Sequence, residues 1–480
     1  MASLENMTLP AFGGAKHCPL IPESVFRRRL EAAVSRMETA SLDVLAIYAD
    51  REHFANMAYL IGLDPRFEEA LLLLDRAGKR LLLVGNENMG YLPEADLGLQ
   101  VELFQEFSLM GQPRTKSRPL ADIFVQFGIQ KGTRVGCVGW KGYQSRLVAT
   151  NGATVVGENP LALDLPAYQV DILRKLCGDP ACVTNAIGIF VNPEDGLRIT
   201  NEPEQIAQFE FAATVTSSAV LDVLQNIRPG VAEDELERLM DSRGLTLSCH
   251  RMIGFGEKAK RGLASPSCRR AAPGDAFTVC LGVTGALTSR AGCVVADAGE
   301  LAADLQDFYP RFAANYFDVV AAWYETVRVG VTAGKVFDAV EARRNPELFD
   351  FALNPGHFLH LDEWTHSPFA AGSPIELRSG MALQMDIIPV SRGPFCYVNA
   401  EDGVVLADRA LRDRLAAGWP DCWRRMQRRR KFMQETLGIR LDESLLPLGN
   451  TSGWLPPYAL RLNQAFVHQP PATDGTSNIA

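Results

Sequence analysis

Histidines and carboxylates gather in one part of the sequence. Three of the chain's seven histidines, His357, His360 and His366, lie within one short segment. Asp386 then closes an apolar run, and Glu401 opens another. A histidine and two carboxylates carried by rigid strands can hold a divalent metal ion or act as general acid and base, because each group must reach the same point. We therefore expect a site built from His357, Asp386 and Glu401.

Hydrophobic periodicity predicts the elements that carry these groups. The first part of the chain alternates helical segments with short apolar runs, which predicts an α/β domain. A helix is expected over 23–37, and strands over 42–48, 70–75, 80–85 and 134–139. In the second part of the chain, strands are expected over 276–281, 292–296, 382–388 and 403–406.

The second part of the chain also repeats a pattern. A long helical segment, 204–227, ends at Arg-Pro-Gly-Val, and a new helix begins at Glu233. Further along, a helix over 316–327 ends at Arg-Val-Gly-Val, and another begins near Lys335. Two copies of helix, Arg-x-Gly-Val and helix predict a duplicated domain with pseudo-twofold symmetry.

Composition and punctuation indicate four regions. We expect an N-terminal arm over 1–22, an α/β domain over 23–195, the duplicated domain over 196–440 and an extended tail over 441–480. The tail is rich in Pro, Asn, Gly and Ser, so we expect little structure of its own.

Charge and cysteine usage limit the class of protein. The chain has 480 residues, 47% of them apolar, and a net charge of −9, which argues against a general binder of nucleic acids or anionic membranes. We interpret the basic segment 423–431 as the solvated face of a late helix. The ten cysteines form no CxxC pair, and the N-terminal segment has no signal-peptide pattern, so we expect a cytoplasmic protein.

Several short motifs, in this order, resemble the creatinase, aminopeptidase P and prolidase family. They are the segment 197–206, the helix end 228–236, the turn Gly274-Asp275, the Gly-His at 356–357 and the Ser-Gly-Met at 379–381. The resemblance covers residues 23–440. It implies an α/β (α+β) fold class: an α/β N-terminal domain, then a pita-bread domain whose site lies between its two duplicated halves.

The resemblance also implies which residues take the positions of metal ligands. The metallopeptidases of that family hold two divalent ions with two aspartates, one histidine and two glutamates. His357 takes the histidine position, Asp386 the first glutamate position and Glu401 the second. Cys280 falls at the first aspartate position, and Ala291 near the second. With both aspartates missing, we expect no standard metal pair and no cofactor.

Creatinases form a metal-free branch of the family and hydrolyse a C–N bond of a small guanidino compound. Their catalytic histidine falls near Leu263, and a glutamate expected near Cys293 is absent, so their mechanism does not transfer unchanged. Arg66 resembles a creatinase arginine that reaches across a dimer to a substrate carboxylate, which implies a homodimer. The alternative is a surface arginine in a loop.

Four further residues belong to the candidate site or its surroundings. Either His366 or Trp364 takes the position of the family's second loop histidine, where we expect contact with substrate. We interpret His360 as structural, because it lies between two leucines. Cys280 would face the same site as His357, as a nucleophile or as a small apolar filler.

Three functions follow from these residues. The first is a hydrolase or related C–N lyase that acts on a small polar non-peptide molecule without the standard metal pair, using His357, Asp386 and Glu401. The second is a pseudoenzyme whose pita-bread domain binds a ligand or a protein. The third is an Xaa-Pro-type metallopeptidase with a rearranged site. Fold alone does not choose among them, because the chemistry depends on the site.

Overall fold

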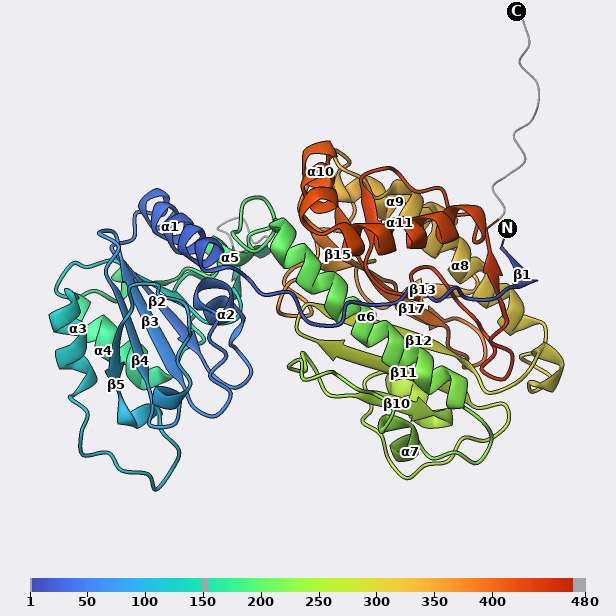
Figure 1. Cartoon of the computed structure of the whole chain (residues 1–480), viewed down its shortest axis with the longest axis horizontal. Coiled ribbons are helices and arrows are strands. Elements are labelled where there is room, and N and C mark those ends of the chain that lie inside the picture. The colour runs from blue at the N-terminus through green and yellow to red at the C-terminus, as the bar shows by residue number, and fades with distance from the viewer. Residues whose placement is uncertain (1, 149–153, 469–480) are drawn as a thin grey trace, which may run out of the picture. The chain divides into compact units, whose positions relative to one another are not determined.

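The computed structural model describes residues 2–148 and 154–468, and the chain divides into two compact units (Figure 1). The N-terminal unit is Ile21–Ile199. The C-terminal unit combines Met1–Leu20 with Thr200–Ala480. None of the helices in the described part of the chain has both the length and the hydropathy to cross a bilayer.

The N-terminal unit is built on a six-stranded mixed sheet in the order β5-β4-β3-β2-β6-β9. Its strands are β2 (Val44–Ala49), β3 (Ala70–Asp75), β4 (Arg80–Val84), β5 (Gln100–Leu103), β6 (Val135–Val138) and β9 (Val183–Asn185), and β7 (Gln144–Val148) pairs with β8 (Thr154–Glu158). Its α-helices are α1 (Glu23–Thr39), α2 (Ala55–Ile61), α3 (Leu120–Phe127), α4 (Ala167–Cys177) and α5 (Gly188–Val191). The predicted helix over 23–37 and the four predicted strands are confirmed.

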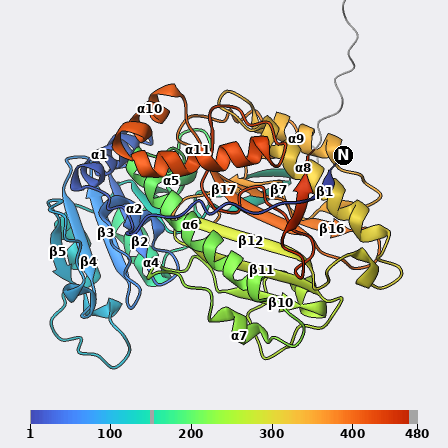
Figure 2. The same cartoon turned by 45° about the vertical axis from the view of Figure 1, so that its right-hand side comes forward.

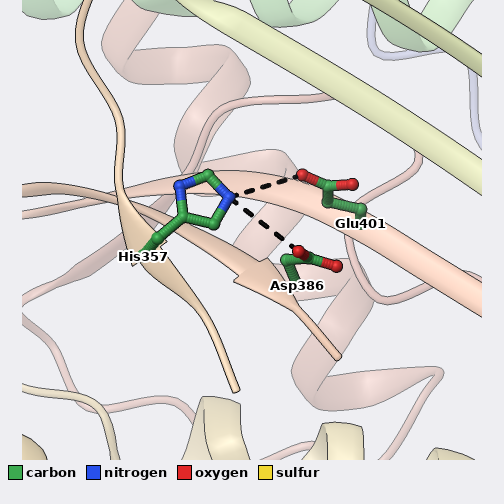
Figure 3. A group of neighbouring side chains, drawn as sticks. All are labelled: His357, Asp386 and Glu401. Atoms are coloured by element: carbon green, nitrogen blue, oxygen red, sulfur yellow. Dashed lines mark ion pairs between the residues drawn. The ribbon is translucent and has the colours of Figure 1, made fainter. Parts of the chain in front are cut away.

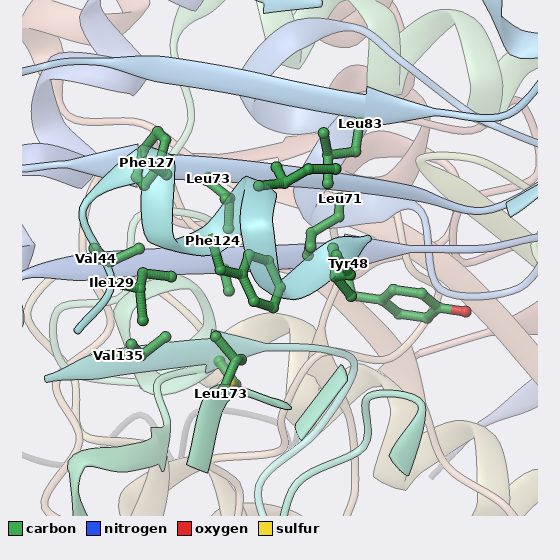
Figure 4. Close-up of a cluster of buried hydrophobic side chains, with 14 of the residues drawn as sticks. Val44, Tyr48, Leu71, Leu73, Leu83, Phe124, Phe127, Ile129, Val135 and Leu173 are labelled. Atoms are coloured by element: carbon green, nitrogen blue, oxygen red, sulfur yellow. The ribbon is translucent and has the colours of Figure 1, made fainter. Parts of the chain in front are cut away.

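Leucine-rich strands form the core of the N-terminal unit. The β3–β4 hairpin is antiparallel, as predicted. One face of the sheet carries Leu71, Leu73 and Leu83, and α3 packs Phe124 and Phe127 into the same buried cluster (Figure 4). Because these strands are buried on both faces, their apolar residues run continuously and do not alternate with polar ones.

The C-terminal unit contains a seven-stranded antiparallel sheet in the order β10-β11-β12-β17-β15-β14, with β18 beside β17. Its strands are β10 (Met252–Phe255), β11 (Ala276–Val283), β12 (Ala286–Cys293), β14 (His357–Phe358), β15 (Ala382–Asp386), β17 (Asn399–Leu406) and β18 (Leu445–Pro447). The helices are α6 (Pro203–Asn226), α7 (Glu233–Glu237), α8 (Phe308–Thr326), α9 (Ala333–Arg343), α10 (Arg409–Gly418) and α11 (Pro420–Glu435). Two short strand pairs complete the unit: β1 (Ser3–Asn6) with β19 (Gln464–Val467), and β13 (Phe349–Phe351) with β16 (Pro389–Ser391).

The predicted duplication is confirmed by matching contacts in the two halves. Gly230 follows α6 and Gly330 follows α8, with φ angles of 87° and 85° that favour glycine. The amide of Gly230 donates to the carbonyl of Ala271, and that of Gly330 to the carbonyl of Leu377, each over 2.8 Å. In each half, the turn after the long helix is therefore bound in the same way to the segment that leads into a strand of the sheet, β11 or β15.

The predicted strand over 292–296 is wrong in its position. The strand is β12, Ala286–Cys293, and it pairs with β11 on one side and β17 on the other. Apart from Leu287 its residues are small or polar, so the sequence carries no strand-like apolar run there. Pairing with two neighbouring strands overrides this local composition.

One face of the sheet packs against α6, and its polar residues are paired there. Thr216 of α6 and Thr288 of β12 hydrogen-bond through their hydroxyls over 2.8 Å. Arg290 of β12 binds Asp402 of β17, with Nη2 2.8 Å from Oδ2, and both side chains are buried. Arg290 also donates to the carbonyls of Thr451 and Trp454 in the tail. Residues 441–468 of the predicted tail are therefore part of the packed unit, contrary to the expectation of little structure, and residues 469–480 lie outside the described residues.

The interpretation of 423–431 as the solvated face of a late helix is confirmed for the helix and wrong for part of its basic residues. Helices α11 and α6 both belong to the C-terminal unit (Figure 2). In α11 the side chains of Arg425 and Arg429 bind the carboxylate of Glu210 on α6, with N–O distances of 2.5 and 2.7 Å, and Arg429 is fully buried. Arg424 and Lys431 do face solvent. These ion pairs could not be predicted from local sequence, because Glu210 lies far from Arg425 and Arg429 along the chain.

We predict that Glu210→Gln lowers the free energy of unfolding by about 3 kcal/mol at neutral pH, because it leaves two arginines without a counter-charge. Burial by itself raises the pKa of Glu210, but Arg425 and Arg429 outweigh burial and lower it. A lowered carboxyl pKa contributes stability above its unfolded value, and this contribution is lost as the pH falls through the folded value. Urea unfolding should therefore show the gap between wild type and variant narrowing below about pH 4. A gap that stays constant with pH would contradict this account.

Candidate functional site

Strand pairing brings four positions into one row on the sheet. Cys280 of β11 lies opposite Ser289 of β12, Ser289 lies opposite Glu401 of β17, and Glu401 lies opposite Asp386 of β15. Directly paired residues share a face, with Cβ atoms about 5 Å apart. The row therefore points away from the α6 face, which holds Thr288, Arg290 and Asp402.

His357 joins this row from β14. It lies opposite Gln384, two positions before Asp386, so His357 and Asp386 share a face. Gly356 precedes it with a φ of 105°, and a Cβ there would lie 2.7 Å from the carbonyl oxygen of Gln384. The glycine allows β14 to approach β15 closely, which brings the imidazole over the strand carboxylates.

The three predicted residues converge on one point (Figure 3). The Nε2 atom of His357 lies 4.0 Å from Oδ2 of Asp386 and 3.7 Å from Oε1 of Glu401. One ligand atom from each residue falls within 4.8 Å of the other two. The exposed fractions of His357, Asp386 and Glu401 are 0%, 5% and 8%. The structure therefore brings together the three residues that the sequence predicted.

Hydrogen bonding leaves two atoms of this centre open. His357 Nδ1 lies 3.1 Å from the Phe358 carbonyl, which fixes that nitrogen as the donor, while Nε2 is buried and has no hydrogen-bond partner. Oδ1 of Asp386 is likewise buried without a partner. The side-chain amide of Gln384 donates through Nε2 to Oε1 of Glu401 over 3.0 Å and holds that carboxylate in place. Buried unpaired polar atoms are costly and often mark a ligand site.

The pKa values of the three residues indicate that a ligand at this centre must carry positive charge. Burial alone lowers the pKa of His357, but Glu363, Glu401 and Asp386 outweigh burial and raise it well above its usual value. Burial and the nearby Glu401 raise the pKa of Asp386 well above its usual value, and burial raises that of Glu401. All of these shifts favour binding of positive charge, as protons or as a metal cation.

Comparison with known families agrees with this geometry. Residues 207–409 match the model of "Metallopeptidase family M24". These residues form an M24 domain. The match includes the whole row of site positions and both helix pairs of the duplicated unit.

Solved structures share the pita-bread fold of the M24 domain. The prolidase of Pyrococcus horikoshii OT3 is 15% identical with a TM-score of 0.58, over 79% of this chain and 95% of that chain. The dipeptidase PepE of Mycobacterium ulcerans is 19% identical with a TM-score of 0.58, over 81% and 94%. The X-Pro aminopeptidase of Thermotoga maritima MSB8 is 13% identical with a TM-score of 0.57, over 79% and 95%. At these identities the likeness shows the fold alone, and no curated protein sequence matches the chain.

Within the M24 domain, strand register refines the position of the second missing aspartate. Ser289 stands in the row with Cys280 and Glu401, whereas Ala291 lies opposite Asn399, outside the row. A two-residue turn at Thr284 and Gly285 sets this register. The prediction from residue spacing placed the second aspartate position near Ala291, which corresponds to a longer turn between β11 and β12 than the structure has. Neither serine nor alanine supplies the charge of an aspartate.

Cys280 packs against apolar side chains. It is buried with Met252 and Leu287, and Cys249 packs against them. Burial raises the pKa of the Cys280 thiol well above its usual value, and neighbouring acidic groups raise it further. The same causes raise the pKa of Cys249 to about 12. Both thiols are therefore neutral at physiological pH, which favours the filler role over the nucleophile.

The remaining predicted residues fall at different places. Trp364 stacks on His357, with ring centroids 4.2 Å apart, whereas His366 is exposed and its carbonyl accepts from the Phe358 amide. His360 is fully buried against the edge of Phe209, as expected for a structural residue. Leu263 is exposed, and its carbonyl lies 2.6 Å from Nε2 of His250.

Arg66 lies in the N-terminal unit and is engaged locally. Its Nε donates to Asp64 over 3.0 Å, Nη1 donates to the Arg51 carbonyl, and the guanidinium lies over the Phe54 ring. Nη2 is buried without a hydrogen-bond partner. A role for Arg66 across a dimer stays a prediction.

Glu363 was not predicted. Its Oε1 lies 3.0 Å from Nε2 of His357, closer than either strand carboxylate. It comes from the loop between His360 and His366, where no periodicity marks a buried face. The only available signal was an acidic pair, Asp362-Glu363, inside a histidine-rich segment.

We predict that restoring the two lost charges creates a second cation site. The double variant Cys280→Asp/Ser289→Asp places one carboxylate opposite Glu401 and a second next to that one, and like charges this close favour a shared dication. Titration with manganese, followed by electron paramagnetic resonance, should give two bound ions in the variant and at most one in wild type. The control Cys280→Asn/Ser289→Asn adds similar bulk without charge and should resemble wild type. Two ions in wild type, or no gain in the aspartate variant, would contradict the prediction.

Proposed function

We propose that this protein is a hydrolase that cleaves a C–N bond in a small polar molecule, at a centre of His357, Asp386 and Glu401 that replaces the family's metal pair. The observation that carries the proposal is the buried Nε2 of His357, which lies 3.0 Å from Glu363 and faces two strand carboxylates at 3.7 and 4.0 Å. The M24 hydrolase fold supports the reaction class. A non-peptide substrate is part of the proposal.

The donor set fits one divalent ion and does not fit two. One imidazole nitrogen and two carboxylate oxygens within 4.8 Å of one another can hold a single ion, and His357 Nε2 and Asp386 Oδ1 have coordination capacity left. On the other half of the row stand a serine and a neutral thiol. An ion held by His357, Asp386 and Glu401 would acidify an attacking water and polarise the scissile group.

The same residues can also move protons. The raised pKa values of Asp386 and His357 mean that these side chains retain protons, so Asp386 Oδ1 or His357 Nε2 can donate a proton to a leaving nitrogen. Glu401, fixed by the Gln384 amide, can accept a proton from an attacking water. Burial of all three side chains excludes bulk water, which strengthens each electrostatic interaction.

The test uses purified full-length protein and a panel of small amides, ureas and guanidino compounds, with amine and ammonia release as the readout. We predict that His357→Gln lowers turnover by at least about 100-fold with little change in melting temperature, because a general acid–base group contributes this much. His17→Ala, at an exposed histidine, is the control and should retain full activity. Equal activity of His357→Gln and wild type would remove His357 from the mechanism.

A second candidate is an Xaa-Pro-type metallopeptidase with a single-ion site. Similar solved structures are named as prolidases, dipeptidases and X-Pro aminopeptidases, and the three-residue donor set fits one ion. Proline release from Xaa-Pro dipeptides at rates well above those of the small-molecule panel would favour this candidate. Elemental analysis of the same sample, prepared without chelator, then shows whether activity follows the bound metal.

A third candidate is a pseudoenzyme that binds without turnover. The loss of acidic groups at Cys280 and Ser289 supports it. Binding of panel compounds without any bond cleavage, in wild type and His357→Gln alike, would favour this candidate over both hydrolases.

A further inference from the structure

Among the three carboxylates around His357, Glu363 lies nearest to Nε2 of the imidazole. Its Oε1 is 3.0 Å from His357 Nε2, although the two atoms are not aligned as a hydrogen bond. Its side chain is 24% exposed, whereas the other site residues are almost fully buried. Glu363 therefore stands between the buried centre and solvent.

The loop that carries Glu363 is held against β14 by several contacts. The Phe358 amide donates to the His366 carbonyl over 2.8 Å, and the Thr365 amide and hydroxyl both donate to the Phe358 carbonyl. The Ser367 hydroxyl donates to the Gly356 carbonyl over 2.6 Å. Trp364 stacks on the His357 ring. These contacts close the loop onto the strand on either side of His357 and fix where Glu363 points.

The distances from His357 Nε2 to the three carboxylates lie between those of adjacent and opposite ligands of one ion. Adjacent ligands of a six-coordinate ion with bonds of about 2.1 Å lie about 3.0 Å apart, and opposite ligands about 4.2 Å apart. From His357 Nε2, the distances to Glu363, Glu401 and Asp386 are 3.0, 3.7 and 4.0 Å. All three fall within that range.

Charge leads to the same conclusion. Among the described residues, the ion pairs formed by Glu363, Asp386 and Glu401 all have His357 as the partner. Three carboxylates facing one imidazole leave an excess of negative charge next to a buried centre. A divalent cation compensates that excess.

From these contacts we propose that Glu363 is a cation-binding residue, the third carboxylate of a single divalent-ion site with His357, Asp386 and Glu401. The site is the one used in the proposed function, so the inference rests on it. Glu363 supplies from a loop part of the charge that the sheet lacks at Cys280 and Ser289. Oxygen-rich donors with one imidazole suit manganese or zinc.

The experiment titrates the full-length protein with manganese alone and measures affinity by electron paramagnetic resonance and calorimetry. Wild type should bind one ion. Glu363→Gln, which keeps size and removes charge, should weaken binding at least tenfold, and Glu363→Asp should fall between them. Asp362→Asn, in the same loop, is the matched control and should bind like wild type. Melting temperatures of the metal-free variants check that each one folds.

Manganese affinity tests this proposal independently of enzyme activity. Equal manganese affinity in Glu363→Gln and wild type overturns it, as does a lower melting temperature with unchanged affinity, which would mean a purely structural role. Wild type that binds no manganese but turns over substrate also overturns it, and leaves the hydrolase proposal intact. Binding that depends on Glu363, without turnover of any panel compound, supports this inference and contradicts the hydrolase.

Discussion

The register between β12 and β17 is the constraint on which the site depends. Side chains alternate between the faces of a strand, so a shift by one residue would turn Glu401 toward α6 and bring Asp402 onto the site face. The buried ion pair of Arg290 and Asp402 opposes such a shift, because the shift would separate two charges that have no water to solvate them. Carbonyls of Thr451 and Trp454 hold the same guanidinium, so the C-terminal tail helps to fix the position of Glu401.

The same register divides the row into two chemically different halves. On one half, Asp386 and Glu401 lie side by side under His357, and Glu363 approaches from a loop. On the other half, Ser289 and Cys280 stand beside Met252, Leu287 and Cys249, where burial keeps the thiols neutral. The carboxylates of the row therefore lie on one half only, and the other half offers no charged group to a second dication.

Much of the fold could be predicted from the sequence, because periodic segments carry their own signal. The helix α1, the β3–β4 hairpin and the repeat of helix, Arg-x-Gly-Val and helix were all read from local pattern. The position of β12 was not, because its small and polar residues form a strand only between two partners. The buried arginines of α11 were missed for a related reason, since their partner Glu210 is distant in sequence.

The candidate site shows the same division between local and long-range information. His357, Asp386 and Glu401 follow from residue type and the ends of apolar runs, and the structure brings them together. The place of Ser289 in the row depends on the length of the β11–β12 hairpin, and the position of Glu363 depends on how its loop folds back over β14. Neither is marked by hydrophobic periodicity in the sequence. The most direct test is a crystal structure grown with manganese, with an anomalous difference map recorded at the manganese absorption edge. The account predicts one peak, bounded by His357, Asp386, Glu401 and Glu363; two peaks, or none among these residues, would contradict it.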